Sequence, residues 1–353
     1  MTGKVLVTGG AGFIGSHIVE RLLELGYSVA VVDNLSTGRI ENLSSIRADV
    51  EFHETDVRNL AEILRLCSGV DYVIHEAAMN RVQRSVDDPI QANQINVDGT
   101  LNVLLAARNN NAEKLVYASS SSVYGGGGSD PGSRRAETQP TAPESPYAVS
   151  KLAAENYCLS FARVYGLNVS CLRYFSVYGP RQRADIQYAA VVPKVIAAVR
   201  TGTPLTIYGD GNQTRDFTYV KDTVEATVMC LRSDIAGVYN IARGERSSVN
   251  DLVEQVEEIV GKSVDRVFLP TPKGDWRDSA ADITKITAAG FTPKFSLKTG
   301  LEDMLLAREE GDWYRERLRF LGNTRLMQET LGDLGKSDLG ESGQRPQCPS
   351  DAL

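Results

Sequence analysis

Residues 4–15 read KVLVTGGAGFIG, and this stretch decides the fold class. It begins with a short run of branched apolar side chains, and the residues from Ser16 to Leu25 carry the apolar spacing of a helix. Between them, Gly9 permits a tight turn, Gly12 lets the backbone approach a pyrophosphate, and Gly15 lets the helix pack on the strand. The amino terminus of a helix also attracts an anion. The stretch therefore predicts a strand, a phosphate-binding turn and a helix.

The second apolar run indicates which dinucleotide binds. Residues 28–32 read SVAVV and lead into Asp33. The Asp33 carboxylate can accept hydrogen bonds from an adenine ribose and would repel a ribose phosphate, which favours NAD over NADP. Asp33 is also a suitable cap for a turn over residues 33–36, so this alternative stays open.

The remaining apolar runs alternate with helical stretches. Strands are expected at 71–74, 114–118 and 169–174, with one helix near 90–109 and another that carries Lys151. This order predicts an α/β fold, a doubly wound parallel Rossmann sheet with a smaller α/β substrate-binding lobe. Ligands of such sheets bind at the carboxyl ends of the strands.

The chain divides into two expected lobes and a tail. Residues 1–175, joined by the returning segment 217–243, are expected to form an NAD-binding Rossmann domain. Residues 176–216 and 244–321 are expected to form the substrate-binding lobe. Residues 125–146 are rich in Gly, Pro, Ser and Thr and predict a loop over the site. The polar residues 322–353 predict a disordered tail.

Composition excludes several classes of function. A net charge of -7 argues against a nucleic-acid or anionic-membrane partner. No leader peptide or membrane-spanning stretch is recognisable in the sequence. The five cysteines are scattered with no CxxC pair, which predicts reduced thiols in a cytoplasmic protein. The three histidines lack the spacing of metal ligands, and His75 is expected to pack at the end of a strand, so no metal is predicted.

Two further motifs together can form a redox site. Residues 119–125 read SSSSVYG, and residues 147–151 read YAVSK. Tyr147 and Lys151 are four residues apart and would share one face of a helix, where the ammonium favours the phenolate. A nicotinamide cation nearby would act in the same direction, so that the phenol could serve as a base at neutral pH. A serine hydroxyl could bridge the phenol and a substrate alcohol. Either motif alone is common by chance.

With these motifs in this order, the chain resembles the extended short-chain dehydrogenase/reductase family, and within it the NAD-dependent nucleotide-sugar 4-epimerases. The resemblance runs from about residue 4 to about residue 320 and includes motifs at 56–57, 75–78, 96–100, 173–175, 179–182 and 215–217. It implies that Ser120, Tyr147 and Lys151 are catalytic. The cofactor contacts that it implies are Gly9, Gly12, Phe13, Ile14, Gly15, Asp33, Asn34, Ser36, Gly38, Asp56, Val57, Ala77, Ala78, Asn96, Ser119, Tyr147, Lys151 and Tyr174. The substrate contacts that it implies are Ser120, Ser121, Ser122, Tyr147, Ser176, Arg183, Ala190, Val191, Thr206, Tyr208, Arg215, Asp275 and Ser279.

The residues after Ser120 restrict the reaction that the resemblance implies. Dehydratases of this family typically carry Asp-Glu there, and nucleotide-sugar decarboxylases carry a Glu, whereas this chain has Ser121 and Ser122. Hydroxyls cannot perform the extra proton abstraction, so only alcohol oxidation and its reversal are expected. This is the chemistry of a 4-epimerase, in which bound NAD accepts the hydride and returns it to the other face of a 4-keto sugar.

The nucleotide implied by the resemblance is UDP. In the similar epimerases, the segment corresponding to 205–209 passes the uracil, and the arginine corresponding to Arg215 grips the diphosphate. A plain surface ion pair between Arg215 and Asp216 is the alternative. The second diphosphate arginine of the family is missing, because Pro272 stands in its place, and Lys273 or Arg277 would have to substitute.

Sugar identity depends on few residues. The small Ser279 leaves room for an N-acetyl group and, with the pattern of residues 187–194, favours UDP-GlcNAc/UDP-GalNAc, with UDP-Glc/UDP-Gal also accepted. Ser176 and Arg183 favour UDP-glucuronate instead, because relatives acting on that acid have a hydroxyl residue and an arginine there. Arg183 could equally face solvent beside Asp185.

Two expectations complete the set. A catalytically silent sensor of NAD or nucleotide sugars is the alternative from another class, because fold alone does not prove activity. A homodimer is implied by the resemblance, through the helix after Asn96 and the helix of Lys151. There Leu101, Leu104, Leu105, Leu152 and Cys158 could supply apolar contacts or face the sheet.

Overall fold

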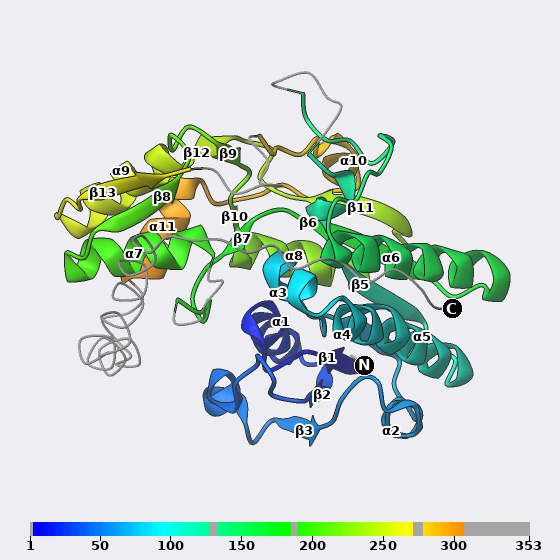
Figure 1. The fold of residues 1–353 in the computed structure, drawn as a ribbon. Coiled ribbons are helices and arrows are strands. Elements are labelled where there is room, and N and C mark those ends of the chain that lie inside the picture. Colours follow the sequence, from blue (N-terminus) through cyan, green and yellow to red (C-terminus); the bar gives the residue numbers. More distant parts are fainter. Residues whose placement is uncertain (1–2, 127–132, 185–189, 271–277, 307–353) are drawn as a thin grey trace, which may run out of the picture. The chain divides into compact units, whose positions relative to one another are not determined.

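A seven-stranded parallel sheet forms the centre of the computed structural model, which describes residues 3–126, 133–184, 190–270 and 278–306 (Figure 1). The strand order is β11-β6-β5-β4-β1-β2-β3, and all neighbouring strands are parallel. The predicted doubly wound α/β fold is therefore confirmed. The strands are β1 Lys4–Thr8, β2 Ser28–Asp33, β3 Val50–Glu54, β4 Tyr72–His75, β5 Lys114–Ser120, β6 Val169–Tyr174 and β11 Gly237–Ile241.

Helices cover both faces of this sheet, which explains the continuous apolar strands. Val5 and Val7 of β1 pack into a core with α1 (Phe13–Glu24) and α8 (Val220–Leu231). Leu6, between them, packs into a second core with α2 (Leu60–Leu66), α5 (Gly99–Asn109) and α6 (Pro146–Tyr165). Successive side chains of a strand point to opposite faces, so every strand except the edge strand β3 supplies both cores.

The predicted helix near 90–109 is present, but its turns are not uniform. It consists of α4 (Pro89–Asn93), a π-helical stretch at Gln94–Asp98 and α5. Inside the wide turn, the buried Asn96 side chain binds the backbone N–H and C=O of Met79 at 2.7 and 3.1 Å. A π-turn in an α-helix is rare and often marks a functional site, and here it positions the segment that follows β4.

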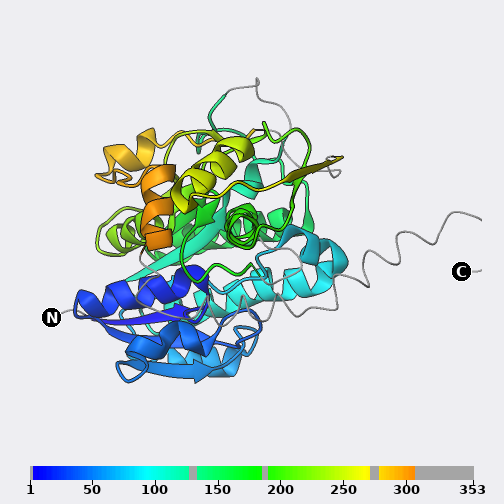
Figure 2. The same cartoon turned by 90° about the vertical axis from the view of Figure 1, so that its left-hand side faces the viewer.

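The rest of the chain lies beside the central sheet. Figure 1 shows β8, β13, α7 and α9 grouped together at the left, and Figure 2 views the molecule from that side. The remaining strand pairs are β8 (Leu205–Tyr208) with β13 (Arg266–Leu269), β7 (Val177–Tyr178) with β10 (Thr218–Tyr219), and β9 (Thr214–Arg215) with β12 (Ser247–Ser248). The remaining helices are η1 Ile40–Ile46, α3 Val82–Asp87, η3 Ser121–Tyr124, α7 Val191–Thr201, α9 Val249–Val260, α10 Thr284–Ala288 and α11 Leu297–Leu306.

The returning segment belongs to the central sheet, because β11 pairs with β6 along its full length. Residues up to Leu305 form one compact unit, so the two lobes are not separate bodies. Their exact division stays a prediction. The predicted tail at 322–353 lies outside the described residues.

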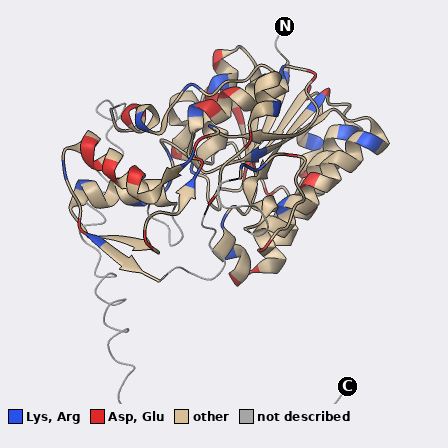
Figure 3. Ribbon diagram, turned by 90° about the horizontal axis from the view of Figure 1, so that it is seen from above, with Lys and Arg blue, Asp and Glu red and all other residues tan. Residues whose placement is uncertain are grey.

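The surface charges and the cysteines of the structure can be compared with the expectations from composition. Figure 3 shows basic and acidic residues interspersed over the helices. Cys67, Cys158, Cys171 and Cys230 are buried and not disulfide-bonded, as expected for reduced thiols, while Cys348 lies outside the described residues. Over the described ranges, none of the helices combines the length and the apolar character needed to span a bilayer.

A buried ion pair ties α6 to the sheet. Glu155 of α6 accepts hydrogen bonds from Arg173 Nε at 3.0 Å and Nη2 at 2.5 Å, and from the Ser119 hydroxyl at 2.6 Å. The Arg173 guanidinium also lies over the Tyr124 ring, 4.6 Å from its centroid. Both charged side chains are almost fully buried. Because α6 and β5 carry the predicted catalytic residues, this pair fixes their relative position.

Replacing Glu155 by alanine should lower the free energy of unfolding by about 3–5 kcal/mol, because Arg173 would be left as an unpaired buried charge. Urea unfolding followed by circular dichroism measures the effect. Asn156→Ala, at the exposed neighbouring position, is the control and should change the value by less than about 0.5 kcal/mol. Equal effects of the two substitutions would contradict the structural role of the pair.

Candidate active site

A cavity of about 870 Å³ opens at the carboxyl ends of β1, β2, β4 and β5, where the sequence predicts the ligand. Sixteen of the eighteen predicted cofactor residues line it, all except Gly38 and Asn96. The predicted substrate residues that line it are Ser120, Ser121, Ser122, Tyr147, Ser176, Arg183 and Ala190. Residues far apart in the chain are thus brought to one site.

The glycine turn after β1 has the geometry that the sequence predicts. Gly9 has a φ of +70°, and a Cβ there would lie 2.7 Å from the Ala77 nitrogen. A Cβ on Gly15 would collide with the Gly9 carbonyl oxygen, so the helix could not pack as closely. The turn leaves the amino terminus of α1 open to the cavity, which suits a pyrophosphate.

Asp33 caps the turn, which is one of the two roles that the sequence left open, while its contact with an adenine ribose stays a prediction. Its carboxylate accepts backbone N–H groups of Ala11 at 3.0 Å and Leu35 at 2.8 Å, so it caps the turn. It also lines the cavity at the end of β2. Burial raises the pKa of this carboxyl, and the two backbone donors oppose the shift. Gly38 lies against the carboxylate, because a Cβ there would be 2.7 Å from Asp33 Oδ2.

Two predicted cofactor residues are engaged elsewhere. Asn96 is buried behind the cavity, where it holds Met79 and donates to the Ser150 hydroxyl at 2.8 Å. Ser119 lines the cavity, but its hydroxyl donates to Glu155. Both residues therefore position other groups in this structure, and direct cofactor contact by them stays a prediction.

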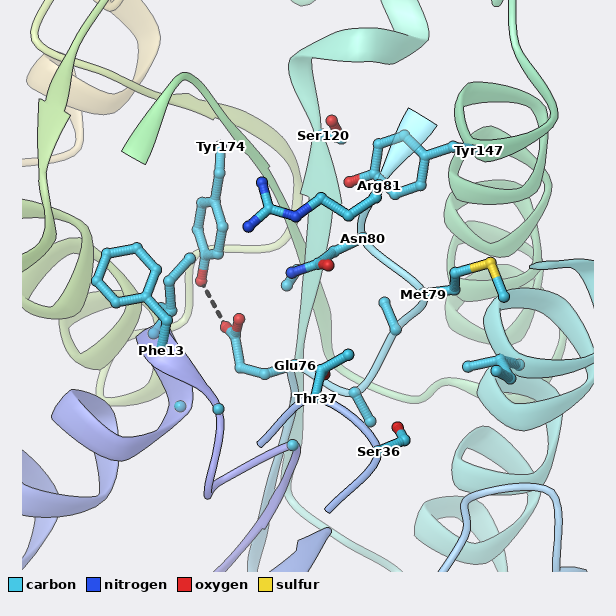
Figure 4. Close-up of a pocket in the computed structure, with 18 of the residues that line it drawn as sticks. Phe13, Ser36, Thr37, Glu76, Met79, Asn80, Arg81, Ser120, Tyr147 and Tyr174 are labelled. Atoms are coloured by element: carbon cyan, nitrogen blue, oxygen red, sulfur yellow. Dashed lines mark hydrogen bonds between the residues drawn. The ribbon is translucent and has the colours of Figure 1, made fainter. Parts of the chain in front are cut away.

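The predicted catalytic residues converge from β5 and α6. Figure 4 shows the Tyr147 phenol directed toward Ser120, the last residue of β5. Ser120 also accepts hydrogen bonds from the Ser122 backbone N–H at 3.2 Å and its hydroxyl at 2.9 Å. One turn after Tyr147, the Lys151 ammonium donates to the Ala118 carbonyl at 2.7 Å. A hydroxyl, a phenol and an ammonium thus border one end of the cavity.

The electrostatics of Tyr147 differ from the sequence expectation. Burial raises the pKa of the phenol, while hydrogen bonding to Ser120 and the charge of Arg81 lower it. The sequence predicts that the Lys151 ammonium lowers this pKa directly, but that ammonium is bonded to Ala118, and its charge acts on Glu76 and His75. Burial also lowers the pKa of Lys151 to about 8. Among the described residues, Arg81 is the cation whose charge lowers the pKa of this phenol.

Glu76 is a cavity residue that the sequence reasoning did not include among the site residues. Tyr174 donates its hydroxyl proton to Glu76 Oε1 at 2.8 Å, a bond drawn in Figure 4, and lies 2.8 Å from Thr227 Oγ1. Burial raises the pKa of Glu76 to about 7, and Tyr174 and Lys151 oppose the shift. The sequence motif HEAA places Glu76 directly after β4. The raised pKa of Glu76 could not be predicted from this motif, because it depends on how deeply the side chain is buried in the folded chain.

A second cavity, of about 350 Å³, adjoins the first. Ser176, Val177, Gln182 and Ala190 line both. The second cavity contains the predicted substrate contacts Ala190, Val191, Thr206, Tyr208 and Arg215, of which residues 206 and 208 lie in the predicted uracil segment. A long ligand could therefore extend from Tyr147 to Arg215 through the shared residues.

Three features of the predicted substrate site are not found in the described parts of the two cavities. Asp216 is not the surface partner of Arg215, because it is fully buried and accepts backbone N–H groups of Arg243, Gly244 and Ala281 at 3.0 to 3.1 Å. Ser279 is buried, and its N–H donates to the Thr214 carbonyl, but it is not among the residues that line either cavity. Asp275, Lys273, Arg277 and Asp185 lie outside the described residues, as do residues 187–189.

Comparison with known proteins agrees with this geometry. Residues 5–242 match the NAD dependent epimerase/dehydratase family. The chain belongs to this family. A sequence relative, a putative UDP-glucose 4-epimerase of Methanocaldococcus jannaschii, is 38% identical over 84% of this chain and 96% of its own.

Two solved structures of the family have similar folds. One is a UDP-N-acetylglucosamine 4-epimerase from Methanobrevibacter ruminantium in complex with UDP-N-acetylmuramic acid (38% identity, TM-score 0.82, covering 90% of this chain and 99% of that one). The other is a UDP-glucuronic acid 4-epimerase from Bacillus cereus with UDP-glucuronic acid and NAD (35% identity, TM-score 0.78, covering 85% and 97%).

The cofactor of this family fits the residues present. The glycine turn has no room for side chains at Gly9 and Gly15, and Asp33 presents a carboxylate without a neighbouring cation among its hydrogen-bond partners in the described ranges. These features suit the pyrophosphate and an unphosphorylated adenine ribose of NAD. When bound, NAD would accept and return a hydride.

Glu76→Gln should change how stability depends on pH. An exposed glutamate ionises near 4.5, whereas Glu76 holds its proton to about 7 in the folded chain. Between these values the folded state binds more protons, so the free energy of unfolding falls as pH rises.

The glutamine variant lacks this loss. The free energy of unfolding of Glu76→Gln, relative to that of wild type, should rise by on the order of 2 kcal/mol between about pH 5 and about pH 7. Urea unfolding of protein stripped of cofactor at the two pH values measures the difference. Glu54→Gln, at the exposed end of β3, is the control. A constant offset between Glu76→Gln and wild type would rule out the buried carboxyl as the titrating group.

Proposed function

We propose that this protein is an NAD-dependent UDP-sugar 4-epimerase, an isomerase. The observation that carries the proposal is the convergence of Ser120 and Tyr147 in a cavity that continues toward Arg215. The similar proteins named above are described as UDP-sugar 4-epimerases, which supports the same reaction class.

The residues of the chain would act in both directions of a reversible oxidation. Tyr147, whose phenol is directed toward Ser120, would take the proton from the sugar C4 hydroxyl as hydride leaves C4. The positive charge of Arg81 would stabilise the phenolate, and Ser120 would hold the substrate oxygen. After the 4-keto sugar turns about its linkage to the diphosphate, so that C4 receives the hydride on its other face, Tyr147 would return the proton to the C4 oxygen. Ser121 and Ser122 supply no acid for dehydration or decarboxylation.

We also propose which sugar the UDP-sugar substrate carries. Ser279, which lines neither of the two cavities, favours UDP-GlcNAc/UDP-GalNAc, with UDP-Glc/UDP-Gal also accepted, because a small residue at this position would leave room for an N-acetyl group. UDP-glucuronate is the second candidate, and it gains support from Ser176 and Arg183, which both line the catalytic cavity.

An assay that separates products from UDP-GlcNAc, UDP-Glc and UDP-glucuronate tests these candidates with one enzyme preparation. Turnover of at least one sugar, with retention of bound NAD, is the expected result. Binding of NAD without turnover of any sugar would instead favour the catalytically silent sensor.

A homodimer is also proposed from family likeness, but its contacts need revision. Leu104 and Cys158 are fully buried in the core of their own chain, so they face the sheet. Exposed apolar side chains on the same layer, Ile90, Val149 and Tyr157, are better suited to contact a second copy.

Tyr147→Phe should reduce kcat about 10²- to 10⁴-fold or more while NAD stays bound, because the variant removes only the proton-accepting oxygen. Product analysis and the absorbance of bound cofactor measure the two effects. Tyr157→Phe, at an exposed position on the same helix, is the matched control and should retain activity. Wild-type rates for Tyr147→Phe would refute its assignment as the base.

Ser279→Tyr should selectively reduce activity with UDP-GlcNAc relative to UDP-Glc, by about tenfold or more, if residue 279 limits the space for the acetamido group. The ratio of kcat/KM for the two sugars is the measurement. An unchanged ratio would remove the pocket-size argument.

A further inference from the structure

Arg81 occupies the centre of the catalytic cavity, although no motif singles it out. It lies between β4 and α3, where its backbone is extended (φ -122°, ψ 123°). Figure 4 shows its side chain extending from beside Tyr147 across the cavity toward Tyr174. The guanidinium therefore borders the space where a substrate must meet the base.

The segment that carries Arg81 is anchored on both sides. Before it, the backbone of Met79 is held by Asn96 through two hydrogen bonds. After it, the Ser85 hydroxyl accepts the backbone N–H of Tyr147 at 2.9 Å. A side chain that is supported in this way keeps a fixed relation to the base, as a specificity group must.

Among the residues that the structure describes, Arg81 has no ion-pair partner of opposite charge, and its Nε atom is buried without a hydrogen-bond partner. Burial lowers its pKa, the neighbouring Arg183 acts in the same direction, and Tyr147 opposes them. A guanidinium remains charged under these conditions, and an uncompensated buried charge is costly. This buried cation thus indicates an anionic ligand group, and Arg183 lines the same cavity.

The position of this anion follows from the chemistry of the sugar. Tyr147 must reach the C4 hydroxyl, and the adjacent C5 carries the carboxylate in a hexuronic acid. The diphosphate, in contrast, is expected near Arg215 in the second cavity, which Arg81 does not line. We propose that Arg81, together with Arg183, binds the carboxylate of a UDP-hexuronate, which favours the second candidate of the proposed function, UDP-glucuronate, over the neutral UDP-sugars. The inference rests on the proposed 4-epimerase function.

The test compares wild type, Arg81→Gln and Arg81→Lys as full chains with NAD bound, using UDP-glucuronate and UDP-glucose. Arg81→Gln should lower kcat/KM for UDP-glucuronate about 10- to 100-fold more than for UDP-glucose, because a charge-assisted bond is lost for the acid alone. Arg81→Lys should give a smaller change in this ratio, since it keeps the charge but not the planar fork. Arg65→Gln, an exposed arginine paired with Glu62, controls for net charge.

A binding measurement separates this inference from the proposed reaction. Calorimetry on Tyr147→Phe, with and without Arg81→Gln, should show the same selective loss of affinity for UDP-glucuronate even if no sugar is turned over. Equal losses for both sugars would assign Arg81 to the diphosphate or to the fold and overturn the inference. Preference of the wild type for UDP-glucose in both assays would also overturn it. Thermal melting verifies that each variant is folded.

Discussion

Two buried charged side chains, one turn apart on α6, determine how the active site is assembled. Lys151 donates to the Ala118 carbonyl of β5, and Glu155 binds Ser119 of β5 and Arg173 of β6. Neither charge is tolerable inside the protein without these partners. The helix therefore has one register against the sheet, and that register places Tyr147 beside Ser120. The catalytic geometry is a consequence of satisfying buried charge.

The ionisable side chains that line the cavity come from different helices and strands, and their charges influence one another. Glu76 after β4, Lys151 on α6 and Arg81 before α3 each act on a neighbour in the site. Burial weakens the charged form of each group, so small changes in neighbouring charge alter which groups are protonated. Reversible hydride transfer changes the charge of the nicotinamide. Because Glu76 and Lys151 have pKa values near neutrality, their protonation can change in response. Cofactor chemistry and substrate selection are thus coupled through the same few side chains.

Much of the fold follows from local patterns in the sequence. Residues 4–15 specify a strand, turn and helix, and Gly9, Gly10 and Gly15 lie where an added Cβ would come too close to neighbouring atoms. The strands of the sheet follow from apolar runs that are buried on both faces. The π-turn at 94–98 could not be predicted in this way, because it depends on Asn96 reaching the backbone of Met79.

The sequence by itself determined the nucleotide-binding sheet and the identity of the serine, tyrosine and lysine, because their spacing and order carry that information. Only the tertiary structure decided which charges surround the phenol. Arg81 and Glu76 enter the cavity because β4 lies between β1 and β5, and Lys151 acts on Glu76 because Ala118 holds its ammonium. Electrostatic effects depend on distance and burial, and neither quantity is encoded in the spacing of residues along the chain.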